Sequence, residues 1–307
     1  MSAIGLQQVV IATRPSQLAR WQARAVQDSL AGLWPELSFR TVVIETSGDR
    51  TLDQPLPAIG GKGAFTSELD EALRNRKVDL AVHSLKDLPI ESSPELVLGA
   101  ILMREDPRDV LVSATGAGLD DLPAGAAVGT SSPRRRAQIM RLRPELVIRS
   151  IRGNVETRIR KVKEGQYEAA VLAAAGILRL GLEEHITEWF SLDQMLPAPG
   201  QGALALQCRA DDEQVLELLR PLVSDSLQAV VLAERAFLSH LGGGCSLPVG
   251  AYGETEQNEI NLRGMVASLD GRKVIRVSGR GSEPQQLGEK LGAEALARGA
   301  QEILNVE

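Results

Sequence analysis

The chain has 307 residues, a formal net charge of -6, 43% hydrophobic residues and 24% charged residues. These values predict two or three globular domains with real hydrophobic cores and exclude a disordered or low-complexity protein. Aromatic residues make up only 3% of the chain, and two cysteines are present, which disfavours a surface that stacks nucleic-acid bases and excludes a disulfide scaffold.

No targeting or membrane-spanning segment is predicted. The first apolar run, Val9–Ala12, is short and has no basic residue before it, and the longest run, Ala169–Leu178, is too short to span a bilayer. Both cysteines, Cys208 and Cys245, are therefore interpreted as thiols in a reducing cytoplasm. Neither lies in a metal-ligand pattern, so we expect no metal site.

The first third of the chain alternates between predicted strands and helices. In order, these are a strand over Gln8–Thr13, a helix ending near Leu30, a strand over Ser38–Glu45, a helix over Phe65–Arg76 and a strand over Val78–His83. This alternation predicts a parallel sheet with helices on its faces. A long polar loop separates the second strand from the second helix, with Gly60, Gly61 and Gly63 around Lys62, and exceeds ordinary connections.

Polar side chains follow these strands or lie in the long loop. They are Arg14, Ser16, Lys62, Ser84, Lys86 and Asp87. Because ligands bind at the carboxyl ends of strands in such sheets, we expect these residues to share one site. Asp87 has two interpretations: an ordinary turn residue, or a lone carboxylate among cations that accepts a proton or stabilises a developing positive charge. His83, at the end of the third strand, is interpreted as a structural histidine.

The most basic stretch of the chain runs from Gly129 to Lys163. From Arg134 to Lys163 there are nine Arg and two Lys against only two Glu. Ser132 is predicted to cap a helix that begins at Pro133. Hydroxyls, free backbone N–H groups and guanidinium groups then converge at one strand-to-helix corner, which is how proteins hold anions.

The same arrangement is repeated further along the stretch. Arg152 and Gly153 are predicted to open a second helix that carries Arg158. Arginine favours carboxylates or phosphates, which it can bind with two parallel hydrogen bonds. The alternatives are a solvated basic face and a nucleic-acid surface, although the chain is acidic and no aromatic residue interleaves with the arginines.

The rest of the chain is predicted to form a second α/β domain and a small third domain. The chain leaves the first domain near Arg104–Arg108 and returns to it through Pro197–Gly202. Next come a predicted strand over Glu168–Ala173, a segment Gly176–Gly181 with Arg179, a strand over Ala203–Cys208 and a helix ending at Leu219. A long helix is then predicted over Ser226–Leu241. The strands Glu259–Ser268 and Lys273–Ser278 are predicted to form a hairpin, and a helix over Pro284–Arg298 follows it.

Cys245 directly follows three glycines, Gly242–Gly244. Without side chains, this backbone can approach another molecule closely, so the thiol is a candidate nucleophile or attachment point. The alternative is a small buried apolar residue, the usual state of a free cysteine. Cys208 lies inside a predicted strand, and there the buried interpretation is preferred.

Nine motifs occur in an order that resembles the porphobilinogen deaminase family, also called hydroxymethylbilane synthases. They are IATR, GGKGAFTSELDEAL, VDLAVHSLKDLP, REDPRDV, VGTSSPRRRAQ, IRGNVETR, LAAAGILRLGL, LPAPGQGALALQCR and LGGGCSLPVGAY. The resemblance implies a transferase that joins four porphobilinogen molecules head to tail with loss of ammonia and releases hydroxymethylbilane by hydrolysis, in tetrapyrrole (haem) biosynthesis. It further implies a cytoplasmic monomer that binds neither nucleic acid nor membrane.

The resemblance also implies a dipyrromethane cofactor joined to Cys245 by a thioether, and a catalytic Asp87 that binds pyrrole N–H groups and stabilises the cation formed as ammonia leaves. The implied cofactor-binding residues are Ser84, Lys86, Asp87, Thr130, Ser131, Ser132, Arg134, Arg135, Arg152, Gly153 and Cys245. The implied substrate-binding residues are Arg14, Ser16, Lys62, Arg152, Arg158, Arg179 and Gln201. The chain departs from the family at Ala58, where many relatives carry a second lysine.

The implied fold is α/β, with two domains like periplasmic binding proteins around a cleft and a small C-terminal α+β domain. The implied boundaries are residues 1–103 with 198–222, residues 104–197, and residues 223–307. The expected hinges lie near Met103–Asp106 and Leu196–Gly200. A solute-binding protein with the same architecture is an alternative that leaves Cys245 and Asp87 without a role. Steep salt-dependent retention on DNA would instead support a nucleic-acid binder.

Overall fold

The computed structural model describes residues 5–50, 63, 65–90, 93–244 and 247–305. The chain divides into two compact units. The first unit is Met1–Arg104 with Ala203–Gln228, and the second unit is Glu105–Gly202 with Ala229–Glu307. The second unit contains both a five-stranded and a three-stranded sheet, and the division of the chain into three domains stays a prediction.

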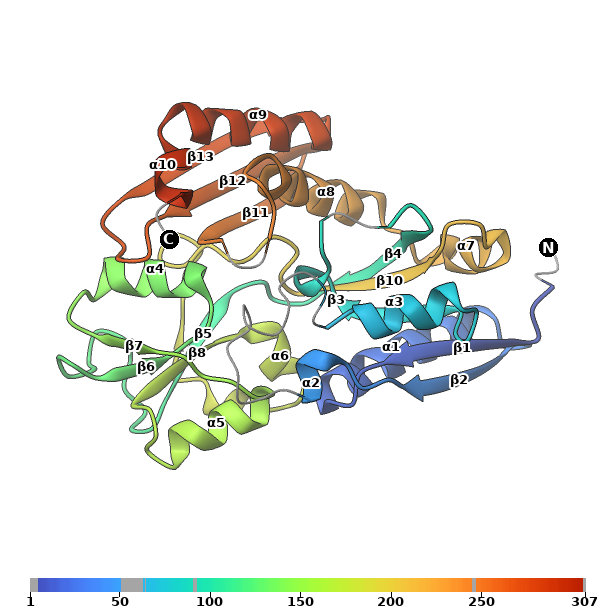
Figure 1. The fold of residues 1–307 in the computed structure, drawn as a ribbon, viewed down its shortest axis with the longest axis horizontal. Coiled ribbons are helices and arrows are strands. Elements are labelled where there is room, and N and C mark those ends of the chain that lie inside the picture. Colours follow the sequence, from blue (N-terminus) through green and yellow to red (C-terminus); the bar gives the residue numbers. More distant parts are fainter. Residues whose placement is uncertain (1–4, 51–62, 64, 91–92, 245–246, 306–307) are drawn as a thin grey trace. The chain divides into compact units, whose positions relative to one another are not determined.

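A five-stranded sheet in the order β2-β1-β3-β10-β4 forms the centre of the first unit (Figure 1). Its strands are β1 (Gln8–Thr13), β2 (Ser38–Val43), β3 (Leu80–Ser84), β4 (Leu96–Arg104) and β10 (Ala203–Arg209). Strand β1 pairs in parallel with β2 and β3, whereas β10 runs antiparallel to β3 and β4. The expected parallel sheet is therefore mixed, because β10 arrives from a distant part of the chain and enters in the opposite direction.

The helices of the first unit bury apolar stripes against this sheet. They are α1 (Gln17–Leu33), α2 (Ser47–Arg50), α3 (Ser67–Arg74) and α7 (Glu213–Leu219), with the 3-10 turns η2 (Leu85–Asp87) and η4 (Arg220–Leu222). In α1, Ala23, Val26 and Leu30 recur at helical spacing and are fully buried against side chains of β1, β3 and β10. Burial of a side chain such as Leu30 contributes about 1.5–3 kcal/mol, which helps to hold α1 against the sheet.

The second unit repeats the strand arrangement of the first. Its five-stranded sheet has the order β7-β6-β8-β5-β9. The strands are β5 (Asp109–Ser113), β6 (Ala127–Gly129), β7 (Val147–Arg149), β8 (Ala169–Ala173) and β9 (Glu188–Trp189), and the helices are α4 (Pro133–Leu142), α5 (Val155–Lys163), α6 (Ala174–Arg179) and the 3-10 turn η3 (Glu183–His185). Strand β6 is parallel to β7 and β8, while β5 is antiparallel to β8.

A three-stranded antiparallel sheet, β11-β12-β13, completes the second unit. Its elements are β11 (Val249–Glu256), β12 (Glu259–Ala267), β13 (Val274–Gly281), α8 (Asp225–His240), α9 (Pro284–Ala297) and α10 (Ala300–Leu304). Helices α8 and α9 cover one face (Figure 1), where a side chain on Gly264 would come within 2.5 Å of the Phe237 ring. On the other face Met265 packs with Ala137 of α4.

The predicted fold class, two similar α/β parts with a small α+β part, is confirmed by these sheets. The predicted hairpin is also confirmed, since β12 and β13 pair around a turn in which Gly271 has a φ of +72°. Within the described ranges, no helix combines the length and apolar character that a membrane crossing requires.

Candidate active site

The first unit gathers five of the predicted site residues at one edge of its sheet. Because β1 and β3 are parallel neighbours, their carboxyl ends meet at the same edge. Arg14 and Ser16 follow β1, Ser84 is the last residue of β3, and Lys86 and Asp87 lie in η2 immediately after it. Asp87 is exposed, which leaves its carboxylate accessible to a ligand.

Ser16 and Ser84 are both held by helix α1. Ser16 caps the helix, its hydroxyl accepting a hydrogen bond from the backbone N–H of Ala19 at 3.2 Å. The side chain of Gln22, only 3% exposed, donates to the Ser84 hydroxyl oxygen at 2.8 Å. Sequence reasoning missed Gln22, because a glutamine within a helix carries no pattern that indicates a distant partner.

Arg14 is fixed by a carboxylate that sequence reasoning missed. Its Nε donates to Asp49 Oδ2 at 3.1 Å and its Nη2 to Asp49 Oδ1, and its guanidinium lies 4.2 Å from the centre of the Phe65 ring. Burial alone would raise the pKa of Asp49, but the hydrogen bonds and charge of Arg14, with bonds from Thr46, hold that pKa below its usual value.

His83 is a buried neutral histidine. Burial lowers its pKa to about 4, a hydrogen bond with Gln207 opposes this shift, and the charge of Arg14 adds to it. Within the described part of the chain, neither His83 Nε2 nor Gln207 Oε1 has a hydrogen-bond partner. His83 is thus a buried, neutral residue of the sheet, and its structural interpretation is retained.

We expect the imidazole of His83 to stay neutral in the folded protein down to about pH 4. The ordinary value is 6.5, so the unfolded chain takes up this proton first as the pH falls. The resulting contribution to stability, about 3 kcal/mol, is present above pH 6.5 and is lost as the pH falls toward 4. Histidine NMR titration, assigned with His83→Gln, checks this. Titration of His83 near pH 6.5 in the folded protein would contradict it.

The second unit gathers the other hydroxyl and arginine positions at the carboxyl edge of its sheet. Strands β6, β7 and β8 are parallel, so their carboxyl ends meet at one edge. Thr130–Ser132 follow β6, Arg152 and Gly153 follow β7, and Arg179 ends α6, which follows β8. Two helix N-termini, those of α4 and α5, begin at this edge.

Both predicted helix starts are confirmed. Ser132 caps α4 by accepting from the backbone N–H of Arg135 at 3.4 Å, with Pro133 as the first helical residue. Asn154 caps α5 by accepting from the backbone N–H of Thr157 at 2.8 Å. Gly153, with a φ of +110°, precedes this cap, and a side chain there would come within 2.6 Å of Thr157.

The hydroxyls before α4 are themselves ordered. Thr130, 4% exposed, accepts from the backbone N–H of Ser132 at 3.2 Å. Ser131 donates to the carbonyl oxygen of Ile151 at 2.8 Å and lies 2.8 Å from the Ser150 hydroxyl. The turn after β6 is thereby fastened to the turn after β7. Arg158 reaches back in the same way, its Nε donating to Gly153 O at 2.8 Å.

A buried carboxylate pairs with the first two arginines of the basic stretch. Asp109 is 0% exposed, and it accepts from Arg134 Nη1 at 2.7 Å and from Arg135 Nη2 at 2.7 Å. Burial alone would raise the pKa of Asp109, but the charges and hydrogen bonds of the two arginines hold it far below its usual value. A solvated basic face is therefore the wrong interpretation for these two residues, which are 3% and 6% exposed.

Gln201 and Arg179 are also buried, and they hydrogen-bond to the backbone at Pro107 and Gly202, near the two ends of the segment Glu105–Gly202. The Gln201 amide donates to Pro107 O at 2.7 Å and to Asp109 Oδ1 at 2.9 Å. Arg179 Nη2 donates to Gly202 O at 2.7 Å. These two residues of the predicted substrate set thus order the backbone of the second unit around Asp109.

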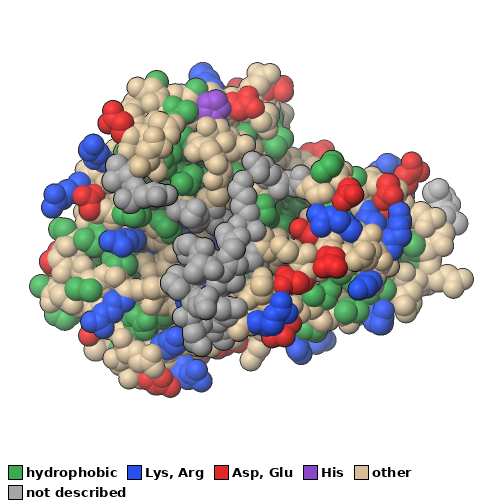
Figure 2. All heavy atoms as spheres, in the orientation of Figure 1, with side chains coloured by type: hydrophobic (Ala, Val, Ile, Leu, Met, Phe, Trp, Pro, Cys, Tyr) green, Lys and Arg blue, Asp and Glu red, His purple; other side chains and the backbone are tan. Residues whose placement is uncertain are grey.

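Two predicted site residues, Lys62 and Cys245, and the departure at Ala58 lie outside the described residues. Cys208 is confirmed as a buried core residue of β10, and burial raises the pKa of its thiol to about 11. On the face drawn in Figure 2, basic and acidic side chains are interspersed, with no broad basic field.

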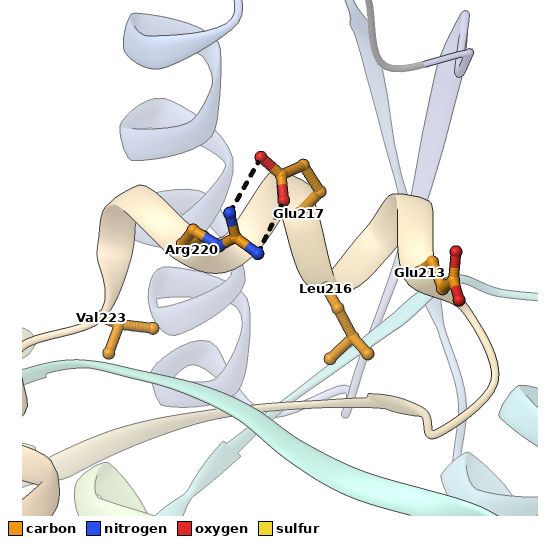
Figure 3. Close-up of a pocket in the computed structure, with 5 residues that line it drawn as sticks. All are labelled: Glu213, Leu216, Glu217, Arg220 and Val223. Atoms are coloured by element: carbon orange, nitrogen blue, oxygen red, sulfur yellow. Dashed lines mark hydrogen bonds and ion pairs between the residues drawn. The ribbon is translucent and has the colours of Figure 1, made fainter. Parts of the chain in front are cut away.

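Two surface pockets lie apart from the predicted residues. One, of about 470 Å³, is lined by α7 and η4 (Figure 3), where Arg220 pairs with Glu217 at 3.1 Å. The other, of about 750 Å³, lies between the end of α4 and the hairpin at Asp270–Arg272. Neither contains a residue of the predicted site, so neither is a candidate active site.

Comparison with known proteins places the chain in a family. Among solved structures, the methionine binding protein MetQ is similar with a TM-score of 0.45 and 15% identity, over 71% of this chain and 91% of that chain. Residues 9–217 match the family model described as porphobilinogen deaminase, dipyromethane cofactor binding domain, and residues 228–297 match porphobilinogen deaminase, C-terminal domain.

Named relatives agree with these models. Porphobilinogen deaminase of Roseiflexus castenholzii is 50% identical over 297 residues, covering 96% of this chain and 98% of that protein. Porphobilinogen deaminase of Brevibacillus brevis is 48% identical over 295 residues, covering 96% of each. With this identity over nearly its whole length and both family models matched, the chain belongs to the porphobilinogen deaminase family.

Proposed function

We propose that this chain joins four porphobilinogen molecules head to tail on a dipyrromethane primer, releasing ammonia at each addition, and then liberates hydroxymethylbilane by hydrolysis. The single observation that supports this most strongly is the edge of the first sheet. There an exposed carboxylate, Asp87, follows β3 among Arg14, Lys86 and two ordered serine hydroxyls. At this edge the Asp87 carboxylate is available to a cation, and Arg14, Lys86 and the serine hydroxyls are available to carboxylates.

The residues of the second unit fit a cofactor that carries several carboxylates. One sheet edge carries two helix N-termini, the Thr130 hydroxyl and Arg152, which are all groups that can donate to an anion. The Ser131 hydroxyl lies at the same edge and donates to the Ile151 carbonyl oxygen, which orders the turn. The dipyrromethane group supplies, when bound, the pyrrole carbon to which a new unit is joined. We propose that Arg134 and Arg135, oriented by Asp109, and the Gly153 backbone hold its acid groups, and that Cys245 carries the thioether.

We assign Asp87 the central chemical role. Departure of ammonia breaks a C–N bond, the nitrogen takes the electron pair, and the substrate is left as a cation. A carboxylate about 4 Å away stabilises such a cation by about 4 kcal/mol at an effective dielectric near 20. After the new C–C bond forms, a pyrrole carbon loses its proton, and Asp87 is the proposed first acceptor.

The substrate's acetate and propionate require cations of their own. We propose that Arg14, Lys62, Arg152, Arg158 and Arg179 serve this purpose, with Ser16 and Gln201. Arg179 also donates to the Gly202 carbonyl oxygen, and Gln201 also donates to Pro107 O and Asp109. We further propose action as a cytoplasmic monomer without nucleic-acid or membrane partners, which agrees with a net charge of -6 and 3% aromatic residues.

The intact mass of the purified protein tests this function. We expect wild type to be heavier than its polypeptide by one dipyrromethane unit, and Cys245→Ser to lose that mass together with activity. Cys208→Ala is the matched control, because the buried Cys208 is expected to keep both. A wild type with the bare polypeptide mass, or a Cys245→Ser variant that keeps the added mass, would refute the cofactor assignment and favour a solute-binding protein.

A further inference from the structure

We propose that Asp49 is a positioning residue that orients Arg14, so that one edge of the guanidinium alone is presented to a substrate carboxylate. The proposal rests on the proposed function only in naming a carboxylate of the substrate as the ligand. Asp49 has no place among the residues that the sequence motifs implied. Its role is inferred from its two hydrogen bonds with Arg14.

A guanidinium group has two edges that can each grip a carboxylate with two hydrogen bonds. One edge is formed by Nε and Nη2, and the other is formed by Nη1 and Nη2. Asp49 occupies the first edge, since Arg14 Nε and Nη2 both donate to it. Nothing else in the described part of the chain bonds the Arg14 side chain, so the Nη1–Nη2 edge is left for a ligand.

The Asp49 carboxylate is itself fixed by hydrogen bonds from Thr46. Its Oδ2 accepts from the Thr46 hydroxyl at 2.7 Å and from the Thr46 backbone N–H at 3.2 Å, and Thr46 is 0% exposed. The Asp49 side chain is 12% exposed, against 22% for Arg14. Asp49, which Thr46 fixes, is therefore the more buried member of the pair, and the Arg14 guanidinium is the member that reaches solvent.

Phe65 fixes the remaining freedom of the arginine. The guanidinium carbon of Arg14 lies 4.2 Å from the ring centre, so rotation of the planar group is opposed by stacking as well as by hydrogen bonding. A ligand carboxylate then meets donors that are already oriented, and binding loses less conformational entropy.

The proposal opposes the simple electrostatic expectation. Removing an anion from a site that binds acids should tighten binding if net charge alone decides affinity. If Asp49 acts by orienting Arg14, its removal weakens binding in spite of the more positive site. A charge-assisted hydrogen bond contributes about 1.5–3 kcal/mol, so loss of orientation predicts a rise in KM of about tenfold or more.

Steady-state kinetics with porphobilinogen decide between these outcomes. We expect Asp49→Asn to raise KM about tenfold with kcat within about twofold of wild type, and Thr46→Val to raise KM by a smaller factor. The matched control is Glu68→Gln, which removes a neighbouring carboxylate bonded to Arg50 and the Ser47 backbone, with no bond to Arg14. Its KM should stay at or below the wild-type value. An unchanged or lower KM in Asp49→Asn overturns the proposal.

A second measurement separates this proposal from the proposed function. The Arg14 guanidinium, followed by NMR of its Nε–H group, should rotate and exchange slowly in wild type and in Glu68→Gln, and faster in Asp49→Asn. This readout needs no substrate. If wild type fails to consume porphobilinogen, the proposed function fails, and the Arg14 signal still decides the positioning role. An Arg14 signal that is the same in all three proteins refutes it.

Discussion

Replacing Asp87 with alanine is expected to lower kcat for porphobilinogen consumption by about 100- to 1000-fold. The physical reason is the loss of an exposed carboxylate that directly follows β3, at a sheet edge that also carries Arg14 and Lys86. Removing a group that stabilises charge formed in a transition state typically costs about 2.7–4 kcal/mol, which corresponds to this range of rates. Single-turnover release of ammonia is the direct measurement.

The same variant should fold normally, which makes the result interpretable. Asp87 is exposed, and substitutions at such positions usually change stability by less than about 0.5 kcal/mol. Unfolding in urea should therefore match wild type. Asp87→Glu keeps the charge on a longer side chain and should recover part of the rate. Full activity in Asp87→Ala would overturn the catalytic assignment while leaving the fold and the family unaffected.

Replacing Asp109 is expected to produce the largest loss of stability. Its carboxylate is fully buried and accepts from Arg134, Arg135 and Gln201. Removing one partner of a buried ion pair leaves an uncompensated charge and costs about 3–5 kcal/mol, and here two arginines lose their counter-ion. We expect Asp109→Asn to lower the free energy of unfolding by at least this amount, measured by urea denaturation.

Asp193→Asn is the matched control, because Asp193 also pairs with an arginine, Arg263 at 3.2 Å, but its side chain is 88% exposed. An exposed pair contributes at most about 1 kcal/mol, so this variant should unfold close to wild type. Equal unfolding midpoints for the two variants would contradict the role of Asp109. The pH dependence of stability offers a further check, because the pKa of Asp109 in the folded protein lies well below 3.8. The contribution of Asp109 to the free energy of unfolding is present above pH 3.8 and is lost only as the pH falls further.

Local chemistry allowed much of the fold to be predicted. The strand Gln8–Thr13 and the helix that begins at Pro133 appear where the sequence placed them, because alternation of apolar runs and the Ser132-Pro133 cap act over a few residues. The grouping of Arg14, Ser84 and Asp87 also followed from sequence, since parallel strands bring their carboxyl ends together. The antiparallel direction of β10 could not be predicted from the sequence, because it depends on the path by which the chain returns to the first sheet.

The sequence by itself determined the family, the order of strands and helices, the two helix-start corners and the residue types that meet carboxylates and a cation. The tertiary structure alone decided which charges neutralise one another. Asp109 meets Arg134 across 25 positions, Asp49 meets Arg14 across 35, and Gln22 meets Ser84 across 62. No local period encodes such pairs, because each depends on the register and packing of separate elements. Those buried partners determine which guanidinium edges remain for acids from outside.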